Sequence, residues 1–164
     1  MSDTPLPPAD LAELHFHRLL VAIDGSDNAE LALAAAMTAS RREHGRLTLI
    51  SVAPRVMRTA FGSAAISPEQ LQREADGEAE RVLREAVRRL PDDVGATTIF
   101  RQGKPGPEIV AEARNGDYDA ILLGARGVGR VGALIGSVSQ HVLHHADIPV
   151  IVIHAPSGRS ASPG

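Results

Sequence analysis

Five short apolar segments are spaced along the chain, and each is long enough for a buried β-strand. Most of them are continuous rather than alternating in hydrophobicity. This is typical of strands in a parallel sheet, because helices cover both faces of such a sheet. The segments are Leu19 to Ile23, Leu47 to Val52, Ala96 to Phe100, Ala120 to Leu123 and Pro149 to Ile153.

Helical patterns lie between the apolar segments. Ser26 precedes the first helix and Ser67 the second as candidate N-caps, and Gly45 follows the first helix as a candidate C-terminal residue. Strict alternation of strands and helices predicts an α/β fold: a single doubly wound, five-stranded parallel sheet of the Rossmann-like type. The predicted helices cover residues 27–43, about 67–90, about 107–114 and about 138–145.

Length and composition narrow the class of protein. The 164 residues suffice for one domain, and 43% hydrophobic with 23% charged residues is typical of a globular protein. A net charge of −3 and 2% aromatic residues argue against nucleic-acid binding. The absence of cysteine fits a reducing compartment, and neither a signal peptide nor a membrane-spanning segment is evident. We expect a cytoplasmic protein without nucleic-acid or membrane partners.

The termini differ in composition from the rest of the chain. The first segment contains Pro5, Pro7 and Pro8, and the last is rich in Ser, Gly and Pro. Such compositions favour mobile chain ends. We therefore expect a flexible segment over residues 1–15, one domain over 16–155 and a flexible tail over 156–164.

Two distinctive segments follow the first and fourth predicted strands. Asp24-Gly25-Ser26 comes after the first strand, and a glycine-rich segment from Gly124 to Gly132, followed by Gly136-Ser137, comes after the fourth. Open parallel sheets bind ligands at the carboxyl ends of their strands, where the strand order reverses. If the strand order is 3-2-1-4-5, these segments meet in one crevice at that point.

The second segment has the chemistry of a phosphate-binding loop. Glycines let backbone N–H groups approach an anion, and a helix that begins near Gly136 would direct its first N–H groups toward negative charge. Arg126 and Arg130 could add cationic contacts. A second interpretation stays open, because Ser137 with Gln140 also matches an ordinary capping box.

Asp24 likewise has two interpretations. It is either a turn residue or a hydrogen-bond acceptor for ribose hydroxyls or a base amine.

Other motifs do not point to a different chemistry. Gly127-x-Gly129-x-x-Gly132 matches the dinucleotide fingerprint in letters only, because it does not lie directly between a strand and a helix. His141 and His145 have metal-ligand spacing, yet no third ligand is evident, so a solvated helix face is favoured and no metal site is expected. No nucleophile is paired with a base by motif. We expect no catalytic residues.

Several segments together resemble the universal stress protein family over about residues 17–154. One resembles the family's opening strand, one its Gly-x-Pro segment, one its C-terminal nucleotide motif and one its final turn and strand. They are Val21 to Ser26, Gly103-Lys104-Pro105, Gly124-x-x-Gly127 with Gly136-Ser137-Val138, and His145 to Val150.

The resemblance implies strand order 3-2-1-4-5, a homodimer paired through the last strand (Pro149 to Ile153), and a stress-response function. It also implies that ATP or another adenine nucleotide binds, with or without Mg²⁺. In nucleotide-binding members, the position of Asp24 holds the nucleoside, and that of Val52 packs on adenine. The glycine and serine positions hold the ribose and phosphates. The candidate nucleotide-binding residues are Ala22, Asp24, Val52, Leu123, Gly124, Arg126, Gly127, Gly136, Ser137 and Val138.

One departure from the family pattern concerns the glycine loop. Eight residues, Val128 to Ile135, separate Gly127 from Gly136, where the family pattern has one residue more. A shorter loop would take a different path over the phosphates. The sequence therefore also allows a dimeric adaptor of the same fold that binds no nucleotide, or a slow ATPase, and it does not identify a protein partner.

Overall fold

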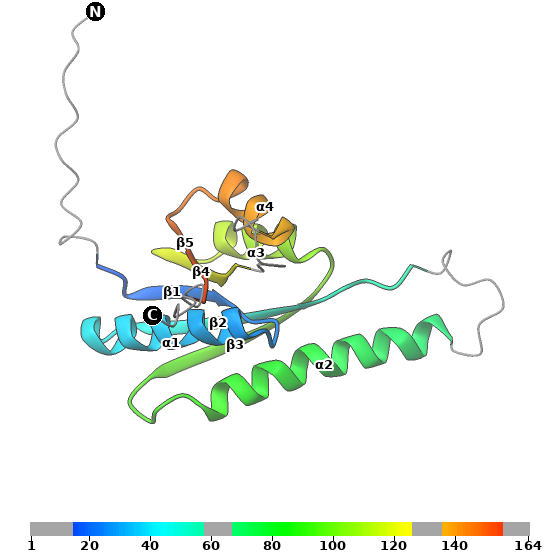
Figure 1. The fold of residues 1–164 in the computed structure, drawn as a ribbon, viewed down its shortest axis with the longest axis horizontal. Coiled ribbons are helices and arrows are strands. Elements are labelled where there is room, and N and C mark those ends of the chain that lie inside the picture. The colour runs from blue at the N-terminus through cyan, green and yellow to red at the C-terminus, as the bar shows by residue number, and fades with distance from the viewer. Residues whose placement is uncertain (1–14, 58–66, 126–135, 156–164) are drawn as a thin grey trace, which may run out of the picture.

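Strands and helices alternate along the chain in the computed structural model, which describes residues 15–57, 67–125 and 136–155 (Figure 1). The strands are β1 (Arg18–Ala22), β2 (Arg46–Ala53), β3 (Gly95–Gln102), β4 (Ala120–Gly124) and β5 (Val150–Ile153). The helices are α1 (Asp27–Glu43), α2 (Pro68–Arg88), α3 (Pro105–Asn115) and α4 (Ser137–His145). The sequence predicts flexible segments over residues 1–15 and 156–164. Of these, residues 1–14 and 156–164 lie outside the described ranges, so the prediction is not tested.

The strands form one parallel sheet in the order β3-β2-β1-β4-β5, which confirms the predicted fold class. Strand β1 is central, because Leu19 pairs with Leu47 of β2 on one side and with Ala120 of β4 on the other. This is the point where the strand order reverses, so the ends of β1 and β4 lie next to each other. Strands β3 and β5 form the two edges.

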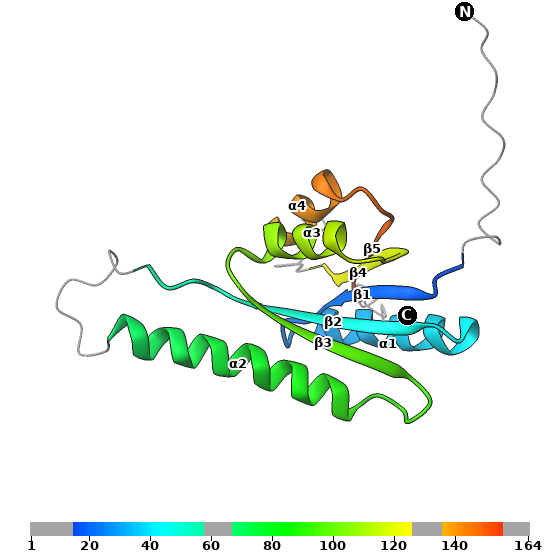
Figure 2. The ribbon, with the colours of Figure 1, turned by 180° about the vertical axis from the view of Figure 1, so that it is seen from behind.

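Helices cover both faces of the sheet, as Figures 1 and 2 show from opposite sides. Helices α1 and α2 pack on one face, and α3 and α4 pack on the other. Side chains of β1 alternate between the two cores. Leu19 and Val21 join the α1–α2 core, and Leu20 joins the α3–α4 core, all at 0–1% exposure. Burial on both faces explains the continuous apolar segments in the sequence.

The N-terminal ends of the first two helices follow the predicted capping chemistry. Ser26 Oγ accepts a hydrogen bond from the backbone N–H of Ala29 at 3.2 Å. Ser67 Oγ accepts one from the N–H of Gln70 at 3.1 Å, with Pro68 in the first helical position. Both bonds satisfy N–H groups that have no partner within the helix.

The C-terminal end of α1 differs from the expectation. The left-handed residue is His44, with φ of 50°, and not Gly45. Gly45 is needed for a different reason, because a Cβ atom there would lie 2.7 Å from the carbonyl oxygen of His17. The glycine therefore allows a close approach of two backbones rather than a helix-ending conformation.

Helix α3 starts two residues earlier than predicted, at Pro105, with Lys104 as its N-cap. Proline is well suited to the first helical position, where its missing N–H costs no hydrogen bond. In the part of the chain that the structure describes, no helix is both long enough and apolar enough to span a membrane.

Candidate functional site

A cavity of about 500 Å³ opens at the carboxyl edge of the sheet. The ends of β1, β2 and β4 form its floor, and residues of α1, α2, α3 and α4 form its walls. A cavity of this size, with mostly apolar walls and few polar groups, is typical of small-molecule sites. It lies where the strand order reverses, as expected for this fold.

The structure brings eight of the ten candidate residues together around this cavity. They come from segments far apart in the sequence and meet because parallel strands end at the same edge of the sheet. Arg126 and Gly127 lie outside the described residues, and the nucleotide-binding role of all ten stays a prediction. The eight are Ala22, Asp24, Val52, Leu123, Gly124, Gly136, Ser137 and Val138.

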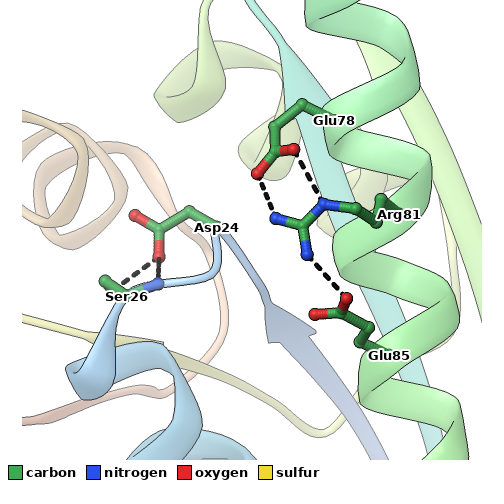
Figure 3. Close-up of polar contacts among 5 residues, drawn as sticks. All are labelled: Asp24, Ser26, Glu78, Arg81 and Glu85. Carbon is green, nitrogen blue, oxygen red and sulfur yellow. Dashed lines mark hydrogen bonds and ion pairs between the residues drawn. The ribbon is translucent and has the colours of Figure 1, made fainter.

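Asp24 holds the turn that leads from β1 into α1 (Figure 3). Its Oδ1 atom accepts hydrogen bonds from the Ser26 backbone N–H at 3.0 Å and from Ser26 Oγ at 2.6 Å. The same Ser26 Oγ caps α1, so the carboxylate fixes the cap. The turn interpretation of Asp24 is therefore realised, and the side chain also borders the cavity. The two roles are compatible, because a carboxylate has several acceptor positions.

Gly124, at the end of β4, is required by the packing of α1. A Cβ atom there would lie 2.4 Å from the carbonyl carbon of Asn28 and 2.5 Å from the backbone nitrogen of Ala29. Asn28 further ties the two elements together, since its amide donates to the Ala125 carbonyl oxygen and accepts from the Ala155 N–H at 3.0 Å. The packing of α1 on β4 therefore explains the need for glycine at position 124 without any ligand.

The start of α4 corrects one interpretation from the sequence. Gly136 is the N-cap and Ser137 is the first helical residue, so the capping box of Ser137 with Gln140 is wrong. The backbone N–H of Gln140 instead donates to the Gly136 carbonyl oxygen at 2.9 Å. Gly136 has no side-chain oxygen to offer to the first turn. Ser137 is exposed and lines the cavity, where the helix N-terminus favours negative charge.

Ser139 anchors this first turn of α4 to the sheet. Its side chain is 2% exposed, and its Oγ donates to the carbonyl oxygen of Gly124 at 3.3 Å. The N-terminus of α4 is thereby held beside the end of β4. The two parts of the predicted phosphate-binding segment that the structure describes are in contact.

Sequence reasoning missed the wall that α2 contributes. Ala79 and Val82 lie on the buried face of this helix. Both line the cavity, together with Ala75 and Glu78 of the same helix. Small residues on the core face of a helix near the end of a strand could have signalled the space. No sequence signal distinguished Glu78 from the other glutamates of α2.

Glu78 is held by an arginine of its own helix (Figure 3). Arg81 donates from Nε to Glu78 Oε2 at 2.9 Å and from Nη2 to Oε1 at 2.5 Å, and its Nη1 reaches Glu85 Oε1 at 2.6 Å. The hydrogen bonds from Arg81 lower the pKa of Glu78. Glu78 is therefore an ionised acceptor at the cavity wall at neutral pH.

The histidines of α4 are not among the residues that line the cavity. The rings of His141 and His145 stack with centroids 4.1 Å apart, and His141 packs against Gly106 of α3. His145 Nδ1 lies 2.8 Å from the carbonyl oxygen of His141. Among the described residues, no three His, Asp or Glu side chains come together as metal ligands.

The fold is shared with solved structures. A protein of the universal stress protein family from Burkholderia pseudomallei is 26% identical, covers 87% of this chain and 98% of its own, and has a TM-score of 0.69. Two further structures below 25% identity share the fold and hold ligands. The Arabidopsis thaliana protein with AMP bound is 20% identical, with coverage of 85% and 92% and a TM-score of 0.63. The Archaeoglobus fulgidus protein in complex with dAMP is 23% identical, with coverage of 85% and 98% and a TM-score of 0.54.

Sequence comparison identifies the family. Universal stress protein YxiE of Bacillus subtilis is 30% identical over 146 residues, which are 84% of this chain and 99% of that protein. A universal stress protein of Thermus aquaticus is 34% identical over 139 residues, with coverage of 84% and 98%. The model of the universal stress protein family matches residues 15–154. The chain therefore belongs to the universal stress protein family.

Proposed function

We propose that this protein is a cytosolic regulatory protein of the stress response that binds an adenine nucleotide, foremost ATP, in the cavity at the ends of β1 and β4. One observation carries the proposal: Asp24 and the Gly136-Ser137-Val138 segment, at least 112 positions apart in the chain, border one cavity of about 500 Å³. The AMP and dAMP held by two proteins of the same fold support the choice of ligand.

The cavity has an apolar part and a polar part that suit the two ends of a nucleotide. Val52, Ala53 and Val82 offer an apolar surface for a base, next to the carboxylate of Asp24. A carboxylate accepts hydrogen bonds from ribose hydroxyls or an exocyclic amine. The first turn of α4 offers backbone N–H groups and the Ser137 hydroxyl to phosphates. Mg²⁺ would accompany a triphosphate through its phosphate oxygens.

The proposal includes a homodimer that forms through β5. This strand pairs with β4 on one side and is an edge of the sheet on the other, and its sequence from Val150 to Ile153 is entirely apolar. An apolar edge strand favours association unless it is covered. Sedimentation at micromolar concentration should give a dimer, and a monomer there would contradict this part of the proposal.

Two other functions predict different results. A dimeric adaptor that keeps only the fold would bind no adenine nucleotide. A slow ATPase would turn over ATP, and its turnover would disappear in Asp24→Ala or Ser137→Ala protein that remains folded. Nucleotide binding without turnover is the result that the regulatory proposal expects.

The experiment is calorimetric titration of nucleotide-free protein with ATP, AMP and cyclic AMP. We expect saturable ATP binding that weakens by about tenfold in Ser137→Ala, since one hydrogen bond to a charged group is lost. Gln140→Ala is the matched control, because this exposed residue lies on the same helix and does not line the cavity. Equal ATP affinity in the wild type and Ser137→Ala would show that the Ser137 hydroxyl does not contribute to ATP binding. No heat with any nucleotide would refute the proposal.

A further inference from the structure

Lys104 is the only lysine among the 17 Lys and Arg residues of the chain, and it stands beside the candidate cavity. We propose that its ammonium group binds the phosphates of the nucleotide and makes affinity depend on the number of phosphates. This inference rests on the proposed function and assigns a further residue to the same site.

The backbone fixes Lys104 at the rim of the cavity. Lys104 is the N-cap of α3, and the next residue, Pro105, lines the cavity. The preceding Gly103, with φ of 153°, donates its N–H to the carbonyl oxygen of Ala53 at the end of β2 at 2.9 Å. On the other side, the Lys104 carbonyl oxygen accepts from the N–H of Glu108 at 3.1 Å. The lysine is therefore held between the end of β2 and the first turn of α3.

Helix packing brings this position close to the start of α4. A Cβ atom at Gly106 would lie 2.8 Å from Cβ of His141, so the backbone of α3 at Gly106 packs directly against the His141 side chain of α4. His141 is one helical turn after Ser137, and Gly106 is two residues after Lys104. An extended lysine side chain reaches roughly 6 Å from its Cα atom, because it has five bonds of about the length of backbone bonds. The proposal places its ammonium beside an anion bound at the N-terminus of α4.

Charge around the cavity directs phosphates to this side. The carboxylates of Asp24 and Glu78 lie on the side of α1 and α2, where they repel phosphate groups. On α3 and α4 the other Lys or Arg residue is Arg114, at the far end of α3 and paired with Asp147 at 2.8 Å. Lys104 makes no ion pair with any residue in the described ranges.

Lysine chemistry fits this role. The ammonium is a compact charge with three donors on a flexible stem, so it can follow phosphates of different chain length. Glu108 is the nearest carboxylate along α3, and its Oε1 atom lies against Gly103. The attraction of Lys104 for an anion should increase from AMP to ATP, and an uncharged nucleoside should not sense it.

The first test compares Lys104→Gln with Arg55→Gln. Arg55 is the matched control, because it is an exposed cation that follows Pro54, another proline of the cavity wall, on the side of β2 and α2. By calorimetry we expect Lys104→Gln to weaken ATP binding about tenfold, AMP binding less, and adenosine binding not at all. Arg55→Gln should change ATP affinity less than twofold, and Lys104→Arg should retain most of it. Equal losses in the two glutamine variants, or equal losses for ATP and adenosine, would overturn the proposal.

The second test uses the chemistry of the single lysine in the wild-type protein. Acetic anhydride acetylates Lys104, and the mass of the peptide that contains it reports the extent of reaction. Saturating ATP should slow this acetylation, and saturating adenosine should not. Acetylation at the same rate with ATP and without it would overturn the proposal. If the wild-type protein binds ATP but Lys104 shows neither the expected mutational effect nor protection from acetylation, the role of Lys104 is refuted and the proposed function stands. If the wild-type protein binds no adenine nucleotide, the proposed function itself is refuted.

Discussion

Replacing Gly124 by alanine should destabilise the protein strongly, because the added methyl group would meet backbone rather than a movable side chain. It would lie 2.4 Å from the Asn28 carbonyl carbon and 2.5 Å from the Ala29 nitrogen. Ordinary carbon contacts begin at roughly 3.5 Å, so β4 and the start of α1 must separate by about 1 Å. Such a shift also weakens the bonds that Asn28 makes to Ala125 and Ala155.

The expected loss is about 3 kcal/mol, at the upper end of the usual cost of overpacking a core. This corresponds to a fall in Tm of roughly 6–12 °C for a domain of this size. Urea denaturation followed by circular dichroism measures the loss directly. Gly77→Ala is the matched control, because Gly77 lies in α2 with nothing within 4 Å of an added Cβ. That variant should gain about 0.5–1 kcal/mol through higher helix propensity.

Comparing the two variants distinguishes a steric clash at Gly124 from a general effect of replacing glycine by alanine. If Gly124→Ala were as stable as the wild type, the close approach of β4 to α1 would be refuted. If both variants lost stability equally, the loss would reflect a general effect of replacing glycine. The result also matters for binding studies, because a Gly124 variant with weak nucleotide binding could owe that weakness to a displaced α1.

Three further predictions concern the turn after β1 and the histidines of α4. Ser26→Ala removes the cap of α1 and should cost about 1 kcal/mol in urea denaturation; an unchanged midpoint would contradict the capping role. Asp24→Asn keeps an acceptor for Ser26, so the free energy of unfolding should change by less than about 0.5 kcal/mol while nucleotide affinity falls. If the free energies of unfolding and of nucleotide binding fell by the same amount, Asp24 would act only as a turn residue. Partial burial, and then the charge of His145, lower the pKa of His141. Stability should therefore fall as pH drops below about 6.5, less so in His141→Gln, and parallel pH profiles would contradict this.

The sequence predicted the order of strands and helices, and eight of its candidate residues border one cavity at the carboxyl edge of the sheet, while their role in binding stays a prediction. This succeeded because the signals were local. Continuous apolar segments indicated strands buried on both faces, and Ser26 and Ser67 marked helix starts. The rule that ligands bind where strand order reverses then selected Asp24 and the segment around Ser137.

The features that sequence reasoning missed depend on contacts between distant segments. The need for glycine at 124 arises from the backbone of α1, and at 45 from the backbone of His17. The wall formed by α2 depends on how far this helix extends past the end of β2, which its own periodicity does not encode. At the start of α4, glycine and serine both suit an N-cap, so the pattern could not decide between Gly136 and Ser137.

The most direct test of the central claim is a crystal structure of the protein grown with saturating ATP. We predict that the nucleotide lies in the cavity at the ends of β1 and β4, with its base toward Val52 and its phosphates toward the first turn of α4. Electron density for ATP at another surface, or an empty cavity in protein that binds ATP in solution, would contradict it.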